Sequence, residues 1–142
     1  MATRGGIDVK TLAVCYSKTG TTKKVADSVV NELNCDLDEL QFDEKAQTVQ
    51  ASHRPADYDR VIILSPIWAF ALATPMKLYL EKNKAGIKTY SLVVTCGGLG
   101  LRGCVNNCKK AIGKPPEQAL KFRAKVVKQG LFSIDPLKNR QK

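Results

Sequence analysis

The sequence predicts an α/β domain whose mostly parallel β-sheet is covered by helices on both faces. Short apolar runs of the kind found in buried strands alternate along the chain with longer segments of helical periodicity. Three of the apolar runs lead directly into loops rich in glycine, proline or hydroxyl residues. Strands that alternate with helices need right-handed crossover connections, which place helices on both sides of the sheet.

The chain opens with a strand followed by a helix. Thr11–Tyr16 is a near-continuous apolar run and predicts a strand that is buried on both faces. The segment 21–34 has apolar residues at positions i, i+4 and i+8, which predicts an amphipathic helix with one buried stripe: Val25, Val29 and Leu33.

The second strand is expected close to an edge of the sheet, because the apolar residues of the segment 35–40 stand in a more polar setting. Residues 41–58 are polar, and we expect them to be irregular, broken by Pro55 and with His53 in solvent. The next strand is clear from the β-branched run Val61–Leu64.

The middle of the chain repeats the strand–helix pattern. Thr74 and Pro75 predict a helix N-cap followed by proline at the first helical position, with Met76–Lys82 as the helix. Ser91–Thr95 is a further apolar run and predicts another buried strand.

The last predicted elements are a helix and a fifth strand. Cys104–Ile112 predicts the helix, and its two cysteines stand four residues apart, as expected for buried, reduced side chains on one helix face. Leu120–Arg123 predicts the fifth strand, which Val126–Ile134 either extends or replaces. Residues 135–142 are too few and too polar for a full closing helix, so we expect a truncated or absent C-terminal helix and one thinly covered sheet face.

Length and composition are those of one folded domain. The chain has 142 residues, 44% hydrophobic and 25% charged, which fits a single domain over 1–142 with a core over about 9–134 and a polar tail over 135–142. No segment approaches the ~18 apolar residues of a membrane span, and the first residues lack the apolar block of a secretory signal. A cytoplasmic location with reduced cysteines is therefore expected.

The net charge of +10 is unevenly distributed along the chain. Residues 1–71 carry 8 Lys/Arg and 10 Asp/Glu, whereas residues 72–142 carry 15 Lys/Arg and 3 Asp/Glu. Such a basic half is either a solvated surface or a docking surface for an acidic partner or a nucleic acid. Because the basic residues are scattered and no nucleic-acid motif is present, nucleic-acid binding is disfavoured.

The loop after the first strand predicts a phosphate site. Four hydroxyl residues surround Gly20 immediately before the predicted helix: Ser17, Thr19, Thr21 and Thr22. A helix N-terminus offers free backbone N–H groups and the positive end of the helix dipole, which suit a phosphate. The loops 17–22, 65–70 and 95–100 all follow strands, so we expect them on one rim of the sheet, where ligands bind in open parallel sheets.

Other phosphate-binding patterns do not fit this loop. The chain has no G-x-x-x-x-G-K-[ST] string, and G-x-G-x-x-G is absent from the first strand–helix turn. A phosphatase loop that starts at Cys15 needs an arginine where Thr21 stands, and a receiver domain needs carboxylates where Tyr16 and Ser17 stand.

Three segments together resemble the flavodoxin family. The residues 14–22 are similar to its FMN-phosphate loop, 58–69 to the strand and loop that cover one flavin face, and 93–98 to the second flavin loop; the resemblance covers roughly 11–123. It implies a flavodoxin-like three-layer sandwich with a five-stranded parallel sheet of order 2-1-3-4-5.

The resemblance also implies which residues hold FMN. The phosphate would be bound by the first loop: Ser17, Lys18, Thr19, Gly20, Thr21 and Thr22. The flavin would pack between the other two loops: Pro66, Ile67, Trp68 and Ala69 on one side, and Thr95, Cys96, Gly97 and Gly98 on the other. From the residues alone, Trp68 is either a flavin-facing or a core side chain, and Lys18 either pairs with the phosphate or points to solvent.

The implied function is an FMN-binding electron-transfer protein that shuttles electrons between redox enzymes. Its partners would be redox proteins with acidic surfaces, given the basic second half, and the thinly covered face allows a homodimer. The alternatives are a small flavin-dependent NAD(P)H/quinone-type reductase and a flavin-free binding or regulatory module. No nucleophile–base or acid–base constellation is visible in the sequence, which favours a carrier over a hydrolase.

Overall fold

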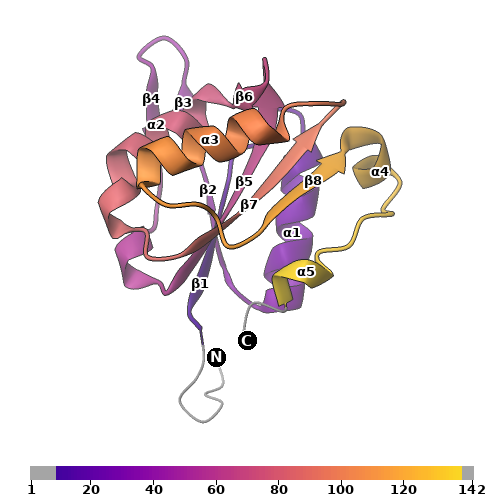
Figure 1. Cartoon of the computed structure of the whole chain (residues 1–142), viewed down its shortest axis with the longest axis horizontal. Helices are drawn as coiled ribbons and strands as arrows, with labels where there is room; N and C mark the ends of the chain where they lie inside the picture. The colour runs from indigo at the N-terminus through magenta and orange to yellow at the C-terminus, as the bar shows by residue number, and fades with distance from the viewer. Residues whose placement is uncertain (1–8, 139–142) are drawn as a thin grey trace.

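The computed structural model describes residues 9–138 and shows a parallel sheet between two helical layers (Figure 1). Its five parallel strands lie in the order β2-β1-β5-β7-β8, which confirms the predicted order 2-1-3-4-5. Their bounds are Thr11–Cys15 for β1, Asp36–Glu39 for β2, Arg60–Trp68 for β5, Tyr90–Cys96 for β7 and Ala119–Arg123 for β8. The central strands are buried along nearly their whole length because helices cover both faces.

One layer of helices consists of α2 (Thr74–Asn83) and α3 (Leu101–Ile112), which lie side by side across the sheet (Figure 1). Thr74 was predicted as the N-cap of α2, but it is the first helical residue and Ala73 is the N-cap. Helix α3 begins three residues earlier than predicted, because Gly100 turns the chain with a φ of 130° and the helix starts directly after it.

The other face is covered by α1 (Thr21–Leu33) and by the end of the chain. Residues 126–134 do not extend or replace the fifth strand: α4 (Ala124–Lys128) follows β8 directly. The final described helix, α5 (Asp135–Lys138), is truncated as expected, yet Leu137 is fully buried. Three apolar side chains from this region pack with α1 and so replace a full closing helix: Val127, Ile134 and Leu137.

Residues 41–58 are more ordered than the sequence predicts. They form an antiparallel hairpin of β3 (Gln41–Asp43) and β4 (Thr48–Gln50), followed by the 3-10 helix η1 (Pro55–Asp57). The Asp43 carboxylate accepts the backbone N–H groups of Lys45 and Ala46, which closes the hairpin turn. The second short 3-10 helix, η2 (Lys84–Gly86), follows α2.

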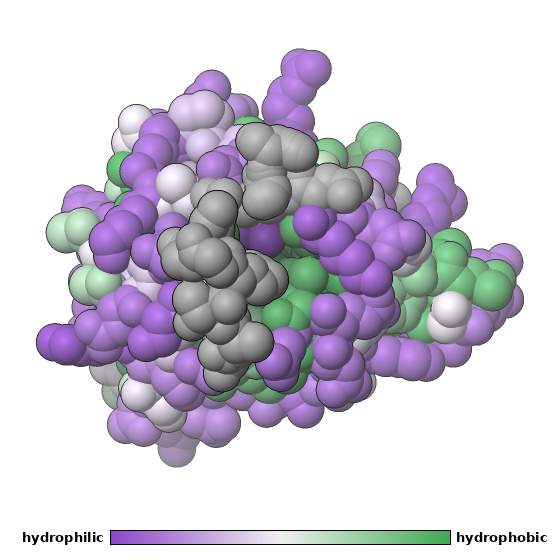
Figure 2. Space-filling view, turned by 90° about the horizontal axis from the view of Figure 1, so that it is seen from below, coloured by the Kyte–Doolittle hydropathy of each residue, from purple (hydrophilic) through white to green (hydrophobic). Residues whose placement is uncertain are grey.

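The amino ends of the parallel strands and the three predicted loops lie at opposite ends of the sheet. Viewed from below, at the amino ends of the parallel strands, the surface is mostly hydrophilic, with apolar surface in its middle and at its right-hand edge (Figure 2). The carboxyl ends of the strands, where the three predicted loops lie, are at the opposite end. Among residues 9–138, no helix has the length and apolar character that a membrane crossing needs.

Candidate site at the carboxyl rim of the sheet

A buried hydrogen bond joins the first and third loops at the rim. The hydroxyls of Thr22, in the first turn of α1, and Thr95, near the end of β7, lie 2.8 Å apart, and both side chains are buried. The backbone N–H of Tyr16 donates to the carbonyl of Leu64, which aligns the ends of β1 and β5. The three loops therefore converge, as the sequence predicts.

The N-terminus of α1 is uncapped by any side chain of the described residues. Gly20 is its N-cap, with a φ of 98°, and its N–H donates to the Ser17 hydroxyl at 3.0 Å. Because the first N–H groups of a helix have no intrahelical acceptor, they are available to an anion. The first turn carries no acidic residue, so nothing negative competes for this position.

Trp68 is fixed at the end of β5 by its neighbours. The Tyr16 ring meets the indole edge-on at a centroid distance of 5.8 Å, and Phe42 meets Tyr16 in the same way at 6.3 Å. Lys18 is exposed, but its ammonium lies 5.9 Å from the centroid of the indole, within range of a cation–π contact. The hairpin β3–β4 thus reaches the rim through Phe42.

The second predicted loop is shorter than expected because β5 continues through residues 65–68. Ile67 pairs with Leu72 and Trp68 with Ala71 of the short strand β6 (Ala71–Leu72), which leaves Ala69 and Phe70 as a two-residue turn. Both turn residues have positive φ angles, 51° and 66°. Such turns usually carry Asn-Gly, so an Ala-Phe pair here is strained.

Helix α3 holds this turn in place. A Cβ atom on Gly103 would lie 1.9 Å from the Phe70 carbonyl oxygen, and one on Gly100 would lie 2.7 Å from Ile67 Cγ2. The Asn107 side chain also accepts the backbone N–H of Leu72 at 3.0 Å. Sequence reasoning missed Phe70, whose side chain is 67% exposed, because neither Ala nor Phe signals a tight turn.

The third loop is open where a ligand would approach. Thr95 and Cys96 are buried, and the Cys96 thiol donates to the Gly98 carbonyl at 3.2 Å. A Cβ on Gly97 or Gly98 would meet no atom within 4 Å, so these glycines leave free space above the rim. The predicted residues Pro66 and Ile67 lie half-buried in β5 beside this space.

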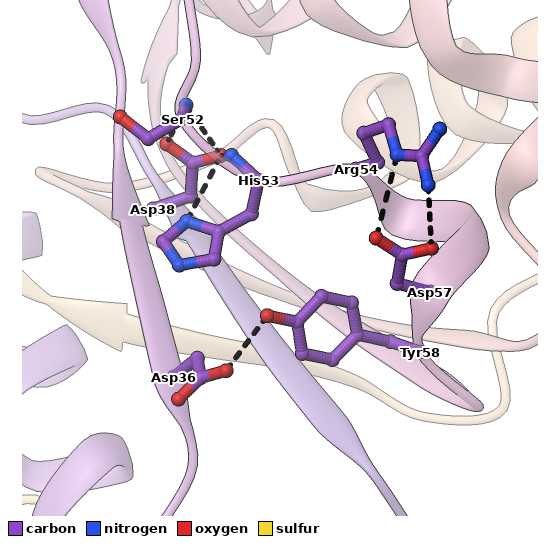
Figure 3. Close-up of polar contacts among 7 residues, drawn as sticks. All are labelled: Asp36, Asp38, Ser52, His53, Arg54, Asp57 and Tyr58. Carbon is purple, nitrogen blue, oxygen red and sulfur yellow. Dashed lines mark hydrogen bonds and ion pairs between the residues drawn. The ribbon is translucent and has the colours of Figure 1, made fainter.

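A separate polar cluster joins β2 to the segment 52–58 (Figure 3). The buried Asp38 carboxylate accepts the backbone N–H groups of Ser52 and His53, at 2.9 and 2.8 Å. The His53 imidazole lies 3.7 Å from the same carboxylate and is half-buried, so the prediction that it points into solvent is wrong. The Tyr58 hydroxyl donates to Asp36 at 2.7 Å; burial and that contact raise the pKa of Tyr58 to about 12.

This cluster anchors the chain between β4 and β5 to the edge strand, so we interpret it as structural.

The core cysteines are also interpreted as structural. Cys104 and Cys108 are buried against the α2–α3 face of the sheet, and burial raises the pKa of Cys104 to about 11 and that of Cys108 to about 12. Thiols with raised pKa values are poor nucleophiles near neutral pH.

The fold and the rim define an α/β protein with a flavodoxin-type arrangement of three loops at the carboxyl ends of its strands. The family model described as a flavodoxin domain matches residues 13–132. The chain therefore belongs to the flavodoxin family. No curated protein sequence matches it.

Solved structures share the fold at low sequence identity. A flavoprotein from Lactobacillus acidophilus NCFM, crystallised in complex with FMN, has a TM-score of 0.72 at 22% identity, covering 86% of this chain and 98% of that one. A flavodoxin from the domain Archaea has a TM-score of 0.56 at 15% identity, with 92% and 99% covered. An FMN-bound flavodoxin from Fusobacterium nucleatum has a TM-score of 0.53 at 18% identity, with 78% and 68% covered.

Proposed function

We propose that this chain binds FMN non-covalently at the rim and carries electrons between redox enzymes of the cytoplasm. The observation that carries the proposal is that three features converge at the rim: the uncapped N-terminus of α1, the Trp68 ring held by Tyr16, and the open loop at Gly97 and Gly98. The Thr22–Thr95 hydrogen bond joins the first and third of them. Membership of the flavodoxin family and the FMN-bound structures of similar fold support it.

The residues present fit FMN. The hydroxyls and backbone N–H groups of residues 17–22 would bind the phosphate. The indole of Trp68 would pack on one side of the flavin ring, where the Tyr16 edge limits its rotation. The backbone at Gly97 and Gly98 would approach the other side, because no side chain fills that space.

When bound, FMN supplies the redox chemistry by accepting and releasing electrons. The protein's own contribution is to hold the ring, to shield part of it from water and to set the charge around it. Within residues 9–138 no group of three or more His, Cys, Asp or Glu side chains is placed to hold a metal ion.

FMN and riboflavin binding test the phosphate site. The double variant Ser17→Ala/Thr19→Ala removes two hydroxyls beside the α1 N-terminus. Because a hydrogen bond to a charged group contributes about 1.5–3 kcal/mol, FMN affinity should fall at least tenfold and riboflavin affinity should change little. Quenching of flavin fluorescence measures both affinities. The matched control is Ser28→Ala/Thr89→Ala, which removes the same groups from mid-α1 and from the amino end of β7.

Three results would count against the proposal. Absence of FMN binding at micromolar concentration, with no absorbance near the ~450 nm of oxidised flavin, would favour a flavin-free module. Equal losses of FMN and riboflavin in the double variant would show that residues 17–22 do not hold the phosphate. Rapid oxidation of NADPH with a quinone by the protein alone would replace the carrier role with a reductase activity.

A further inference from the structure

An apolar pair projects from the rim next to the proposed flavin site. Phe70 and Leu99 are 67% and 76% exposed, and they account for two of the three exposed large hydrophobic side chains among residues 9–138. They come from the second and third loops, which meet where Gly100 packs against the Phe70 backbone. We call these two residues the rim pair.

The turn that carries Phe70 is held in place by α3. The Ala69–Phe70 turn keeps two positive φ angles, and α3 packs so closely against it that Gly103 has no room for a Cβ. An exposed phenylalanine on a strained but fixed turn is poorly explained by folding stability, because strain is retained where the surroundings or a function require it. A backbone held in this way lowers the entropic cost of docking a partner at Phe70.

Basic side chains lie on the elements that border the rim pair. Lys18 lies over the Trp68 ring, Arg102 is exposed on the first turn of α3, and Arg123 is exposed at the end of β8, beside Cys96 in the strand register. We call these three residues the basic flank. None of them forms an ion pair with another described residue, whereas several other cations do: Lys23, Arg54, Lys84 and Lys138.

The second half of the sequence carries a large excess of positive charge. Between residues 82 and 134 Glu117 is the single acidic residue, among eleven Lys and Arg. A positive potential of this extent raises the local concentration of anionic partners and their association rate.

We infer that the rim pair and the basic flank form the docking surface for an acidic redox protein with an apolar contact region. The inference rests on the proposed function, because this surface borders the proposed flavin site and so brings a docked redox centre close to the ring. A nucleic acid fits less well, because it offers no apolar counterpart to Phe70 and Leu99.

Cytochrome c and its fully succinylated derivative are suitable probes, because they have the same fold and the same haem. They differ in surface charge: the lysines of native cytochrome c make it basic, and succinylation of those lysines makes the derivative acidic. The FMN-loaded protein is reduced chemically under argon and mixed with either ferric cytochrome in a stopped-flow instrument. Each ferric haem takes one electron, so one fully reduced flavin reduces two cytochromes and releases its protons to the buffer. The second-order rate is measured from low to high ionic strength.

We expect the succinylated cytochrome to react at least tenfold faster at low salt, with a rate that falls as salt is added, and the native cytochrome to show the opposite salt dependence. Arg102→Glu/Arg123→Glu should remove most of this preference. The control Lys82→Glu/Lys114→Glu makes the same change in charge away from the rim and should retain it. Phe70→Ala should lower the rate of reaction with the succinylated cytochrome at high salt, where electrostatic steering is screened.

Faster reaction of the native cytochrome at low salt, or equal effects of the two charge variants, would overturn the inference. So would tight binding of a 20-base-pair DNA duplex at physiological salt that is lost in Arg102→Glu/Arg123→Glu, because the surface would then be a nucleic-acid site. If the chain takes up no FMN, the proposed function fails by itself. Amide chemical shifts of the ¹⁵N-labelled chain, titrated with succinylated ferric cytochrome, then test docking: shifts centred on residues 69–71 and 99–103 support it, and shifts elsewhere refute it.

Discussion

Replacing Gly103 with alanine should destabilise the protein, although helix propensity favours the opposite. In an exposed helix interior, alanine is better than glycine by about 0.8–1 kcal/mol. In α3, however, a Cβ at position 103 would lie 1.9 Å from the carbonyl oxygen of Phe70, a backbone atom that cannot rotate away. The two atoms have to separate by about 1.1 Å before they reach even 3.0 Å.

This displacement has a cost that can be bounded. Either α3 moves away from the turn, which loosens the 3.0 Å hydrogen bond from Leu72 N–H to the Asn107 side chain, or the strained Ala69–Phe70 turn shifts. Overpacking of this type costs about 1–3 kcal/mol. We therefore expect Gly103→Ala to lower the free energy of unfolding by about 1–2 kcal/mol after the propensity gain is included.

Urea unfolding followed by circular dichroism measures this change, and Asn106→Ala is the matched control. Asn106 is exposed on the same helix, so its replacement gains helix propensity without a clash and should stabilise the protein by about 0.5 kcal/mol. Opposite signs for the two variants are the expected result. A Gly103→Ala protein that is as stable as the wild type, or more stable, would refute the close packing of α3 on the Phe70 turn.

Three further predictions concern buried polar groups. Thr22→Val should lower the free energy of unfolding by about 1–3 kcal/mol because it leaves the buried Thr95 hydroxyl unpaired, and Thr22→Val/Thr95→Val should cost less than the sum of the single variants in a urea double-mutant cycle. Asp38→Ala should cost about 2–5 kcal/mol and speed hydrogen exchange at the two backbone N–H groups that its carboxylate accepts; unchanged exchange there would contradict this. Burial raises the pKa of Cys15 and Cys108 from 9.0 to about 12, so their contribution to stability is complete below pH 9 and is lost as the pH rises from 9 toward 12. Cys108→Ala should therefore make the alkaline decline of the free energy of unfolding shallower. An unchanged slope of this free energy against pH would contradict the assignment.

The parallel strands could be predicted because each is a short β-branched or apolar run with no competing periodicity. Val61–Leu64 is buried on both faces of the sheet, so nearly every side chain along it must be apolar. The rim followed from topology: once the strands are parallel, the loops after them lie on one edge.

The elements that sequence reasoning missed depend on contacts between distant residues. The hairpin β3–β4 has few apolar side chains of its own, and it is fixed by Phe42 against Tyr16 and by the chain that returns to Asp38. The turn at Phe70 has no local signal either, because its conformation is imposed by α3, more than thirty residues later. Burial of Leu137 likewise requires the α1 face to be present.

The strand order converts the uneven charge of the sequence into an uneven charge across the molecule. In the order β2-β1-β5-β7-β8, residues 11–68 form one side of the sheet and residues 90–123 the other. The near-neutral first half, which includes the hairpin with Asp43 and Glu44, therefore lies on one side of the sheet. The basic second half, which includes Arg102 and Arg123, lies on the other. Because the proposed flavin site lies between these sides, we expect an approaching acidic protein to be attracted toward the β8 side and repelled from the hairpin. In the proposed complex, this difference in charge would orient the docked partner.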